Sequence, residues 1–339
     1  MNEIAMLPAE NTSLLSDIHN GGIEVIKMIQ SIENPVITAI IKGITFLGSG
    51  YFYIFLILFI FWCIDEKRGL SLGVLIIISA WANSFAKDIF KHPRPFNLEA
   101  SLGLAHESSY GFPSGHAQIS LTLWIPIAAW RAHAWANKQA EKTKNRRQII
   151  WGGAIFFILL ISFTRLYLGV HFPTDLFAGW LLGGVILIIW FLPGPRLEKL
   201  FASIERRYQN ITVAAIALVM NGLYPGSYSA LFLGFCLGYI FMRKNFPFHA
   251  QAKINGKKPG VKIMFFRCFT GFLGIGIIYL GLKLMLPGEG SLWNGLYSFY
   301  QLADFVRYSL FGFWASAGAP WIFNRMNLSS NELSSNELS

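Results

Sequence analysis

Three short polar clusters interrupt the apolar runs of this 339-residue sequence, and their residue types suit chemistry on a phosphate group. The clusters read KDIFKHPRP at 87–95, PSGH at 113–116 and TRLYLGVHFPTD at 164–175. Each lies at the end of a long apolar stretch. Together they contain cations, histidines, a serine and a carboxylate, which are the groups that bind and transfer a phosphoryl group.

Phosphate oxygens need cationic groups and N–H donors, and the clusters contain both. Lys87, Arg94 and Arg165 supply three cations, and arginine can bind phosphate oxygens in a bidentate manner. Ser114 and Gly115 are expected to open a helix, where free N–H groups and the helix dipole attract an anion. We therefore expect these five residues to bind the phosphoryl group. Taken singly, PSGH could be a simple helix cap, and Lys87 could extend from a helix end to the membrane interface.

Two histidines and one acid suit the covalent chemistry. His116 and His171 can exchange protons near neutral pH, so they can act as nucleophile and as acid. Asp175 follows His171 by four residues, and at helical spacing its carboxylate can approach the imidazole. In that position Asp175 would fix the tautomer of His171 and stabilise the imidazolium, as the third member of a triad does.

The surroundings of these clusters are poor in metal ligands. The other acids nearby are Asp88, Glu99 and Glu107, whereas two-metal phosphatases use several carboxylates or histidines as ligands. The sequence also lacks a glycine-rich nucleotide loop that ends in Lys-Ser or Lys-Thr. We expect a metal-independent reaction that uses no cofactor.

Membrane helices must position these clusters. Hydrophobic residues make up 54% of the sequence and charged residues only 14%, against roughly 25% charged residues in soluble domains. The apolar runs have the length that a helix needs to cross a bilayer. We predict an all-α polytopic membrane protein with about nine spans, at 37–63, 69–91, 114–134, 148–169, 173–193, 209–222, 227–242, 262–286 and 293–318. The sixth and seventh are short and could instead form one re-entrant pair.

The basic residues indicate the orientation of these spans. The connections 131–147 and 243–262 are rich in Lys and Arg, whereas the alternate connections 221–227 and 286–291 contain none. Basic loops are typically cytoplasmic, so all three clusters are expected on the opposite face. The active site would then face the periplasm, another extracytoplasmic side or a lumen. The net charge of +10 indicates contact with anionic lipid headgroups rather than with nucleic acid.

The remaining segments complete the predicted organisation. Residues 1–36 form an N-terminal interfacial segment, because apolar residues recur at helical spacing in GIEVIKMIQSI. Residues 37–208 form a phosphatase core, and residues 209–325 form an additional transmembrane region. The polar repeat LSSNELSSNELS belongs to a disordered tail at 326–339. No basic stretch precedes an apolar one at the N-terminus, so no cleavable signal peptide is expected.

The three motifs, in this order, resemble the signatures of the type-2 phosphatidic acid phosphatase family, which is akin to vanadium haloperoxidases and glucose-6-phosphatase. The match runs from Lys87 to Arg94–Pro95, from Pro113 to His116, and from Thr164–Arg165 through His171 to Asp175. It covers residues 45–193. Threonine stands at 164 where serine is usual, and both carry a hydroxyl that can bond phosphate. The resemblance implies a vanadium haloperoxidase-like six-helix core bundle with additional C-terminal transmembrane helices.

The resemblance also implies a reaction. His171 would attack the phosphorus and form a phosphohistidine, with Asp175 orienting it. His116 would protonate the leaving oxygen and then activate water. The implied enzyme is an integral membrane phosphatase of a lipid phosphate or diphosphate monoester, with the lipid phosphate and membrane lipids as its partners. Candidate substrates are phosphatidic acid, phosphatidylglycerol phosphate, a polyprenyl diphosphate, a sphingoid phosphate or a phosphorylated glycolipid.

Other functions fit parts of the pattern. A lipid phosphotransferase would pass the phosphoryl group to an alcohol, and a phosphatase of a soluble sugar phosphate would use the same groups. A transporter is disfavoured, because the polar residues gather at one face rather than at the bilayer midplane. His106 and Tyr110, in the loop before PSGH, are candidates for shaping the substrate entrance.

Overall fold

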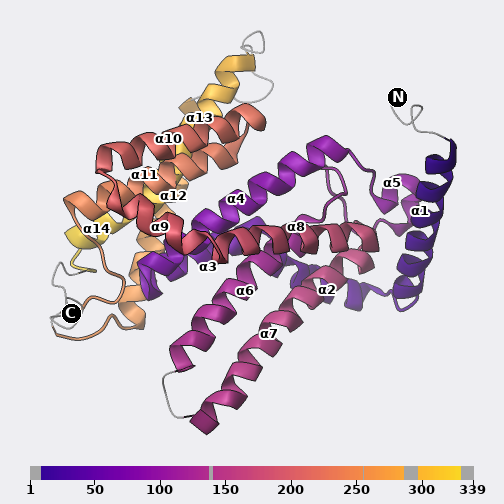
Figure 1. Cartoon of the computed structure of the whole chain (residues 1–339), viewed down its shortest axis with the longest axis horizontal. Helices are drawn as coiled ribbons and strands as arrows, with labels where there is room; N and C mark the ends of the chain where they lie inside the picture. The colour runs from indigo at the N-terminus through magenta and orange to yellow at the C-terminus, as the bar shows by residue number, and fades with distance from the viewer. Residues whose placement is uncertain (1–8, 137–139, 255, 286–296, 330–339) are drawn as a thin grey trace. The chain divides into compact units, whose positions relative to one another are not determined.

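The computed structural model describes residues 9–136, 140–254, 256–285 and 297–329, which form an all-helical protein (Figure 1). The α-helices are α1 (Ala9–Gln30), α2 (Pro35–Thr45), α3 (Gly50–Phe59), α4 (Glu66–Phe90), α5 (Pro95–Leu98), α6 (Gly115–Ala136), α7 (Ala140–Tyr167), α8 (Pro173–Phe191), α9 (Gly194–Ser203), α10 (Arg206–Leu223), α11 (Ser227–Asn245), α12 (Val261–Met285), α13 (Tyr297–Phe313) and α14 (Ala319–Arg325). Short 3-10 turns, η2 (Phe46–Gly48) and η4 (Ala100–Leu102), and π-helical turns, η3 (Ile60–Ile64) and η5 (Trp314–Gly318), connect some of them.

The chain divides into two compact units. The first consists of residues 1–52 and 82–188, and the second of residues 53–81 and 189–339. All the residues predicted to act on phosphate lie in the first unit. The proposed boundaries after 36, 208 and 325 stay predictions, and the tail beyond 329 lies outside the described residues.

The described residues include several membrane-spanning candidates. Four helical stretches are long and apolar enough to cross a bilayer, namely Glu66–Leu98, Asn145–Tyr167, Pro173–Phe191 and Val261–Met285. The bent pair Pro35–Gly48 and Gly50–Ile64 is a fifth if its halves form one span. The chain is therefore a multi-pass integral membrane protein. Helices also lie at the other predicted spans. However, α6, α10, α11 and α13 do not meet the same criterion of length and apolar composition, so nine spans stay a prediction.

Local sequence explains where the helices of the first unit begin. Asn34 caps α2, since its Oδ1 accepts hydrogen bonds from the backbone N–H groups of Val36 and Ile37, both at 3.0 Å. Pro35 follows in the first turn, where its missing N–H costs nothing. Pro173 opens α8 in the same way, and α6 begins at Gly115 directly after Pro-Ser.

Small residues bring α8 close to α6. A Cβ added at Gly179 would lie 2.5 Å from the carbonyl oxygen of Ser114 and 3.2 Å from Cβ of Ala117. The backbone N–H of Ser114 also donates to the carbonyl oxygen of Asp175 at 2.9 Å. The first turn of α8 is thereby held against the first turn of α6, which places their polar residues together.

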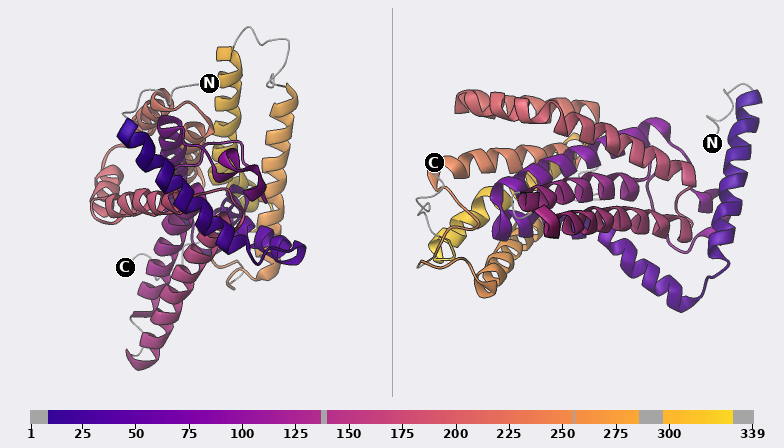
Figure 2. Two further views of the ribbon diagram at one scale, coloured as in Figure 1. Left: turned by 90° about the vertical axis from the view of Figure 1, so that its right-hand side faces the viewer. Right: turned by 60° about the horizontal axis from the view of Figure 1, so that its bottom comes forward.

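Helix α1 runs across the end of the other long helices of the first unit (Figure 2). Ile23 and Ile26 pack with Leu102 and Phe172 in a buried cluster. The side chain of Gln30 donates to the carbonyl oxygen of Leu102 at 2.9 Å. An interfacial position for this segment stays a prediction.

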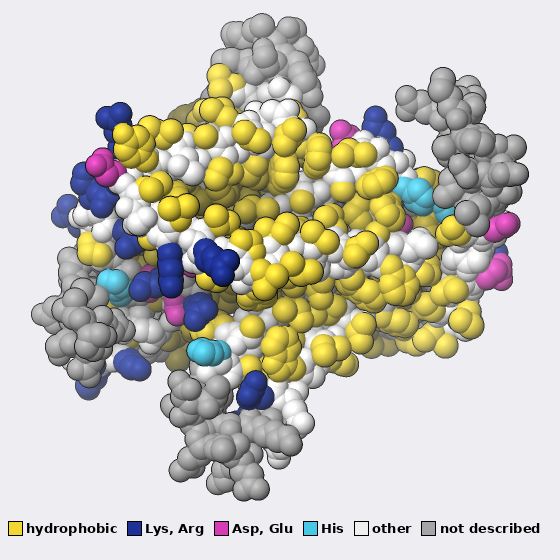
Figure 3. All heavy atoms as spheres, in the orientation of Figure 1, with side chains coloured by type: hydrophobic (Ala, Val, Ile, Leu, Met, Phe, Trp, Pro, Cys, Tyr) yellow, Lys and Arg dark blue, Asp and Glu magenta, His cyan; other side chains and the backbone are white. Residues whose placement is uncertain are grey.

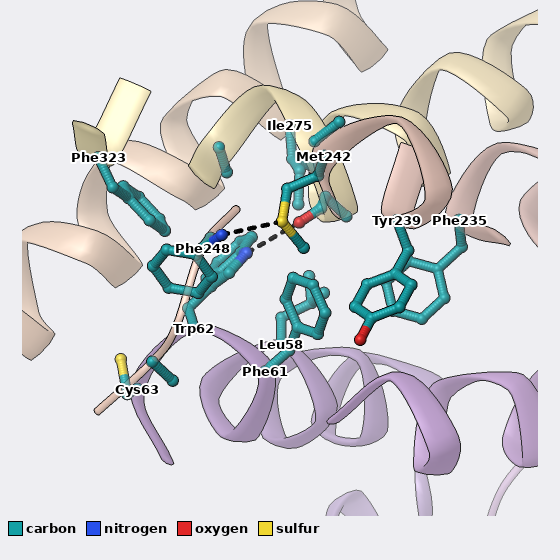
Figure 4. Close-up of a cluster of buried hydrophobic side chains, with 14 residues drawn as sticks. Leu58, Phe61, Trp62, Cys63, Phe235, Tyr239, Met242, Phe248, Ile275 and Phe323 are labelled. Carbon is teal, nitrogen blue, oxygen red and sulfur yellow. Dashed lines mark hydrogen bonds between the residues drawn. The ribbon is translucent and has the colours of Figure 1, made fainter. Parts of the chain in front are cut away.

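The second unit has an aromatic core between η3, α11, α12, η5 and α14 (Figure 4). The indole of Trp62 donates to the carbonyl oxygen of Ala315 at 2.9 Å. The buried guanidinium of Arg267 donates to the carbonyl oxygens of Trp62 and Ala250, both at 2.7 Å, and of Leu328, at 2.9 Å. These carbonyls come from three separate segments, so Arg267 joins them.

Large apolar side chains remain exposed on the outer faces of the helices (Figure 3). Leu181 and Ile188 on α8, and Phe265 and Ile277 on α12, are examples. Such surfaces are unfavourable in water but match the hydrocarbon of a bilayer.

Candidate active site

The eight predicted site residues lie at helix ends and in loops of the first unit. Lys87 is in the last turn of α4, and Arg94 directly precedes α5. Ser114, Gly115 and His116 lie at the start of α6, and Arg165 is in the last turn of α7. His171 immediately precedes α8, and Asp175 lies in its first turn.

His171 and Asp175 form a buried pair. The Nδ1 of His171 lies 3.2 Å from Oδ2 of Asp175, and both side chains are almost inaccessible to solvent. The same Oδ2 accepts the backbone N–H of Phe172 at 2.9 Å, which fixes the carboxylate at the helix start. With Nδ1–H donated to Asp175, the lone pair of His171 is on Nε2, where a nucleophile needs it. This tautomer is assigned from the partner of Nδ1.

Arg94 lies beside that nitrogen. Its Nη1 is 3.3 Å from Nε2 of His171 and donates to the carbonyl oxygen of Val170 at 2.8 Å. Its Nε donates to the carbonyl oxygen of Ser109 at 2.6 Å, and Nη2 donates to that of Tyr110 at 3.1 Å. A guanidinium held in this way would contact the oxygens of any phosphoryl group that reached Nε2.

Lys87 is held by the same loop. Its Nζ donates to the carbonyl oxygen of Tyr110 at 2.6 Å and to Oγ of Ser109 at 3.3 Å. The side chain is buried, and Arg94 contacts the same two residues. The loop before PSGH therefore aligns two of the three predicted cations.

Arg165 is bound by two residues that are far away in the sequence, Thr45 and Glu107. Its Nη1 donates to Oγ1 of Thr45 at 2.8 Å, and its Nη2 donates to the carboxylate of Glu107. The hydroxyl of Thr164 bonds to Thr45 at 3.0 Å and to the carbonyl oxygen of Ile161 at 2.6 Å. Thr164 thus helps to position Thr45, which in turn binds Arg165.

The start of α6 is ordered by buried polar contacts. Ser114 is fully buried, and its Oγ lies 3.5 Å from the backbone N–H of Ala117, in the position of a helix cap. A Cβ at Gly115 would lie 2.9 Å from Oδ1 of Asn83, whose Nδ2 donates to the carbonyl oxygen of Pro113 at 3.2 Å. Asn83 thus packs tightly on the PSGH turn. Phosphate binding by Ser114 and Gly115 stays a prediction.

His116 points from the first turn of α6 toward η2. A Cβ at Gly48 would lie 2.6 Å from Cδ2 of His116, so only glycine leaves room for the ring. The residue as a whole is partly exposed. A proton donor to a leaving group needs this partial access.

The charges of the site act on His171. Burial lowers the pKa of His171 well below its usual range, and Arg94, Arg165, Lys87 and then His116 lower it further by repulsion. The neutral, nucleophilic imidazole therefore persists to more acidic pH than that of a free histidine.

Glu107 is a site residue that the sequence analysis counted only as a possible metal ligand. Its carboxylate accepts from Nη2 of Arg165 and lies 3.8 Å from Nη2 of Arg94. It is a third exposed, whereas both arginines are buried. The carboxylate thus lies between two predicted phosphate-binding cations. Its signal in the sequence was an acid in the loop between the first and second polar clusters.

A pocket of about 380 Å³ opens beside this carboxylate. It is lined by Lys91, His92, Pro93, Phe96, Asn97, His106, Glu107, Ser108, Ser109 and Tyr110. His106 and Tyr110 were the predicted entrance residues. In the part of the chain that the structure describes, no three His, Cys, Asp or Glu side chains are placed to hold a metal ion. A metal-independent reaction stays a prediction.

Comparison with protein families accounts for most of this chain. The model of the PAP2 superfamily matches residues 68–197, and the model of the PAP2 superfamily phosphatase transmembrane extension matches residues 226–331. The chain belongs to the PAP2 superfamily. This confirms the predicted relationship to membrane lipid phosphate phosphatases, a class of hydrolases, and a phosphatase core followed by transmembrane helices. The first match contains the eight predicted residues.

Curated relatives agree with this assignment. Sphingosine-1-phosphate phosphatase 2 of Mus musculus is 26% identical over 323 residues, which cover 83% of this chain and 86% of that protein. Phosphatidylglycerophosphatase B of Bacillus subtilis is 29% identical over 165 residues, covering 48% and 75%. Lipid phosphate phosphatase delta of Arabidopsis thaliana is 24% identical over 213 residues, covering 60% of this chain but only 49% of that protein. The chain thus spans about half of the plant relative.

Among solved structures, this chain is similar to the PAP2-type phosphatidylglycerolphosphate phosphatase of Bacillus subtilis. The identity is 26%, the TM-score is 0.44, and the match covers 58% of this chain and 90% of that structure.

Proposed function

We propose that this chain hydrolyses a lipid phosphate or diphosphate monoester through a phosphohistidine at His171, without a metal ion. One observation carries the proposal: Nδ1 of His171 is held by Asp175, while Nε2 lies 3.3 Å from a guanidinium nitrogen of Arg94. The ring is therefore oriented with its lone pair toward the group that would bind phosphate oxygens.

Two displacements complete the reaction. In the first, Nε2 of His171 attacks the phosphorus, the bond to the leaving oxygen breaks, and that oxygen takes a proton from His116. In the second, His116 takes a proton from water, the water oxygen attacks the phosphorus, and the P–N bond breaks. Asp175 stabilises the charge that His171 carries between the two steps.

The cations stabilise the charge on the phosphoryl oxygens in both steps. Lys87, Arg94 and Arg165 would contact these oxygens from fixed positions, with the N–H groups at the start of α6. A fixed donor of this kind is worth about 3–4 kcal/mol of barrier. Glu107 must leave the space between Arg94 and Arg165 when the phosphate enters.

The membrane arrangement belongs to the same proposal. We place the site at the non-cytoplasmic face of a chain with about nine spans, on a vanadium haloperoxidase-like six-helix core. The distribution of basic loops supports this orientation. Labelling of single cysteines placed in the loop 243–262 tests it, because a label that reacts from outside intact cells would overturn the orientation.

The substrate is proposed from the relatives. Two of them are named for phosphatidylglycerol phosphate and sphingosine-1-phosphate, which are both phosphate monoesters on a lipid. A site at the end of membrane helices suits such amphiphiles, since the tail can remain in the bilayer while the phosphate reaches the cations.

Phosphate release by the purified full chain tests the proposal. The panel contains phosphatidic acid, phosphatidylglycerol phosphate, sphingosine-1-phosphate, a polyprenyl diphosphate and glucose 6-phosphate, in detergent with EDTA and no added alcohol. Release from a lipid phosphate is expected. If no phosphate is released but the phosphoryl group appears on an alcohol that is added in a second reaction, the enzyme is a phosphotransferase. Release from glucose 6-phosphate alone would indicate a sugar phosphatase. Absence of release with all substrates would refute the proposal.

A further inference from the structure

Two imidazoles that the reaction above does not use lie in contact beside the site. Nε2 of His19, on α1, is 2.9 Å from Nε2 of His92. His92 lies in the first polar cluster, between Lys87 and Arg94. His19 lies outside the matched PAP2 range, and the sequence indicated no partner for either histidine.

The other nitrogen of His92 faces the catalytic carboxylate. Nδ1 of His92 lies 3.9 Å from Oδ1 of Asp175. Both atoms are buried, and neither has a hydrogen-bond partner among the described residues. Oδ2 of the same carboxylate already accepts from His171 and Phe172. A ring nitrogen and a carboxylate oxygen are thus left facing each other, and a ring shift of about 1 Å would bring them to hydrogen-bond distance.

Aromatic side chains flank both imidazoles. His19 stacks on Phe172 with 4.9 Å between ring centroids, and His92 meets the edge of the same ring at 6.1 Å. His92 also contacts Phe112, with 5.9 Å between centroids. Phe172 is the residue whose N–H binds Asp175, so the same residue positions the carboxylate and both imidazoles.

We propose that His92 is a positioning residue for Asp175, and that His19 fixes the tautomer of His92. This proposal rests on the function proposed above. In it, His19, His92, Asp175 and His171 act as one hydrogen-bonded series. Nε2–H of His19 donates to Nε2 of His92, which leaves the proton of His92 on Nδ1. That N–H donates to Oδ1 of Asp175 and turns Oδ2 toward His171.

The charged surroundings set how this unit responds to pH. His92 faces His19 on α1 and Asp175 on α8, while Lys87 and Arg94 act on Asp175 from the first polar cluster. Burial lowers the pKa of His19, which favours its neutral form at neutral pH. At acidic pH, protonation of His92 would compete with His171 for the charge of Asp175 and would slow the reaction.

Paired substitutions of His92 separate positioning from packing. In His92→Asn the amide nitrogen takes the place of Nδ1, and in His92→Gln it takes the place of Nε2. We expect kcat of His92→Gln to fall about tenfold or more, the size of one lost hydrogen bond to a charged group. His92→Asn should keep its plateau kcat within about threefold of wild type, and its acid limb should move to lower pH because Asn does not titrate. His133→Gln, at the exposed far end of α6, is the matched control.

The outcome can be separated from that of the proposed function. If wild type releases phosphate and the two variants lose activity equally, or neither differs from His133→Gln, the inference is wrong. Thermal unfolding of each variant in detergent identifies a loss that comes from misfolding. Nitrogen-15 NMR of histidine-labelled protein shows which ring nitrogen of His92 carries the proton, even if the His92 variants are inactive or unfolded. Wild type should show His92 protonated at Nδ1, and His19→Ala should redistribute that proton, whereas a proton on Nε2 in wild type would overturn the inference.

Discussion

Asp175→Asn is the substitution with the clearest expected effect. It keeps the shape of the side chain and removes its charge. Oδ2 of Asp175 accepts two hydrogen bonds, from Nδ1 of His171 at 3.2 Å and from the N–H of Phe172 at 2.9 Å. The neutral amide oxygen of Asn can still accept the N–H of Phe172. It carries no negative charge, so it cannot stabilise a positive charge on His171. The positive charge that develops on the His171 imidazole, when its Nε2 bonds to phosphorus, then has no negative partner.

The structure sets the size of this loss. The pair is almost fully buried, so solvent does not replace the missing charge. His171 is neutral before the reaction and becomes charged as the P–N bond forms, so without Asp175 a buried charge is left unpaired at a cost of about 3–5 kcal/mol. Added to the barrier, this cost corresponds to a decrease in kcat of about 10²–10⁴. An Asp→Asn change in a serine protease triad lowers kcat by about 10⁴, in the same range.

The assay is phosphate release from the best lipid phosphate, with kcat and KM determined separately. We expect kcat to fall and KM to change little, because the hydrogen bonds of Asp175 go to His171 and Phe172 rather than to the cations that would bind the phosphate. Thermal unfolding in detergent should show that the variant folds. A folded Asp175→Asn enzyme within about fivefold of wild type would show that the carboxylate does not assist His171, and the proposed mechanism would fail.

Other predictions follow from the same site. His171→Ala should lose nearly all turnover without loss of fold, measured by phosphate release and thermal unfolding, and near-normal turnover would refute its role as the nucleophile. Arg165→Gln removes a charge that lowers the pKa of His171, so the acid limb of kcat/KM should move to higher pH than in wild type on the same substrate. An unchanged limb would contradict this assignment. Glu107→Gln should bind vanadate or inorganic phosphate about two- to fivefold more tightly, since a partly exposed ion pair contributes up to about 1 kcal/mol, and unchanged or weaker binding would show that Glu107 does not compete with the anion. Arg267→Met should lower the unfolding temperature in detergent by several degrees, since buried carbonyls lose their donor, and an unchanged midpoint would contradict its structural role.

Much of the fold was predictable, because helix formation follows from local pattern. A helix lies at each predicted span, and the polar clusters lie at helix ends where the apolar runs stop. The spacing of His171 and Asp175 predicted their proximity, although His171 precedes α8 rather than lying within it. Their contact arises because Asp175 turns back onto the N–H of Phe172, as a capping residue does.

Contacts between distant segments were not predictable in this way. Thr45 binds Arg165 across 120 positions, and His19 meets His92 across 73. Their residue types have no spacing that distinguishes them from ordinary helix residues. The packing of α1 and α2 onto the ends of α7 and α8 brings them to the site. Glu107 was visible as an acid, but its place between two arginines depends on the course of the loop.

The way the cations are held explains how the site can remain positive. Arg94 and Lys87 are aligned mainly by main-chain carbonyls, from Ser109, Tyr110 and Val170. Carbonyl dipoles orient a cation without cancelling its unit charge, whereas a buried carboxylate in each position would neutralise the site for phosphate. The carboxylate of Glu107 does contact Arg94 and Arg165, and it is partly exposed on a loop. The proposed mechanism requires this carboxylate to turn away into solvent when a dianionic phosphate arrives, so that the phosphate replaces Glu107 between the two arginines.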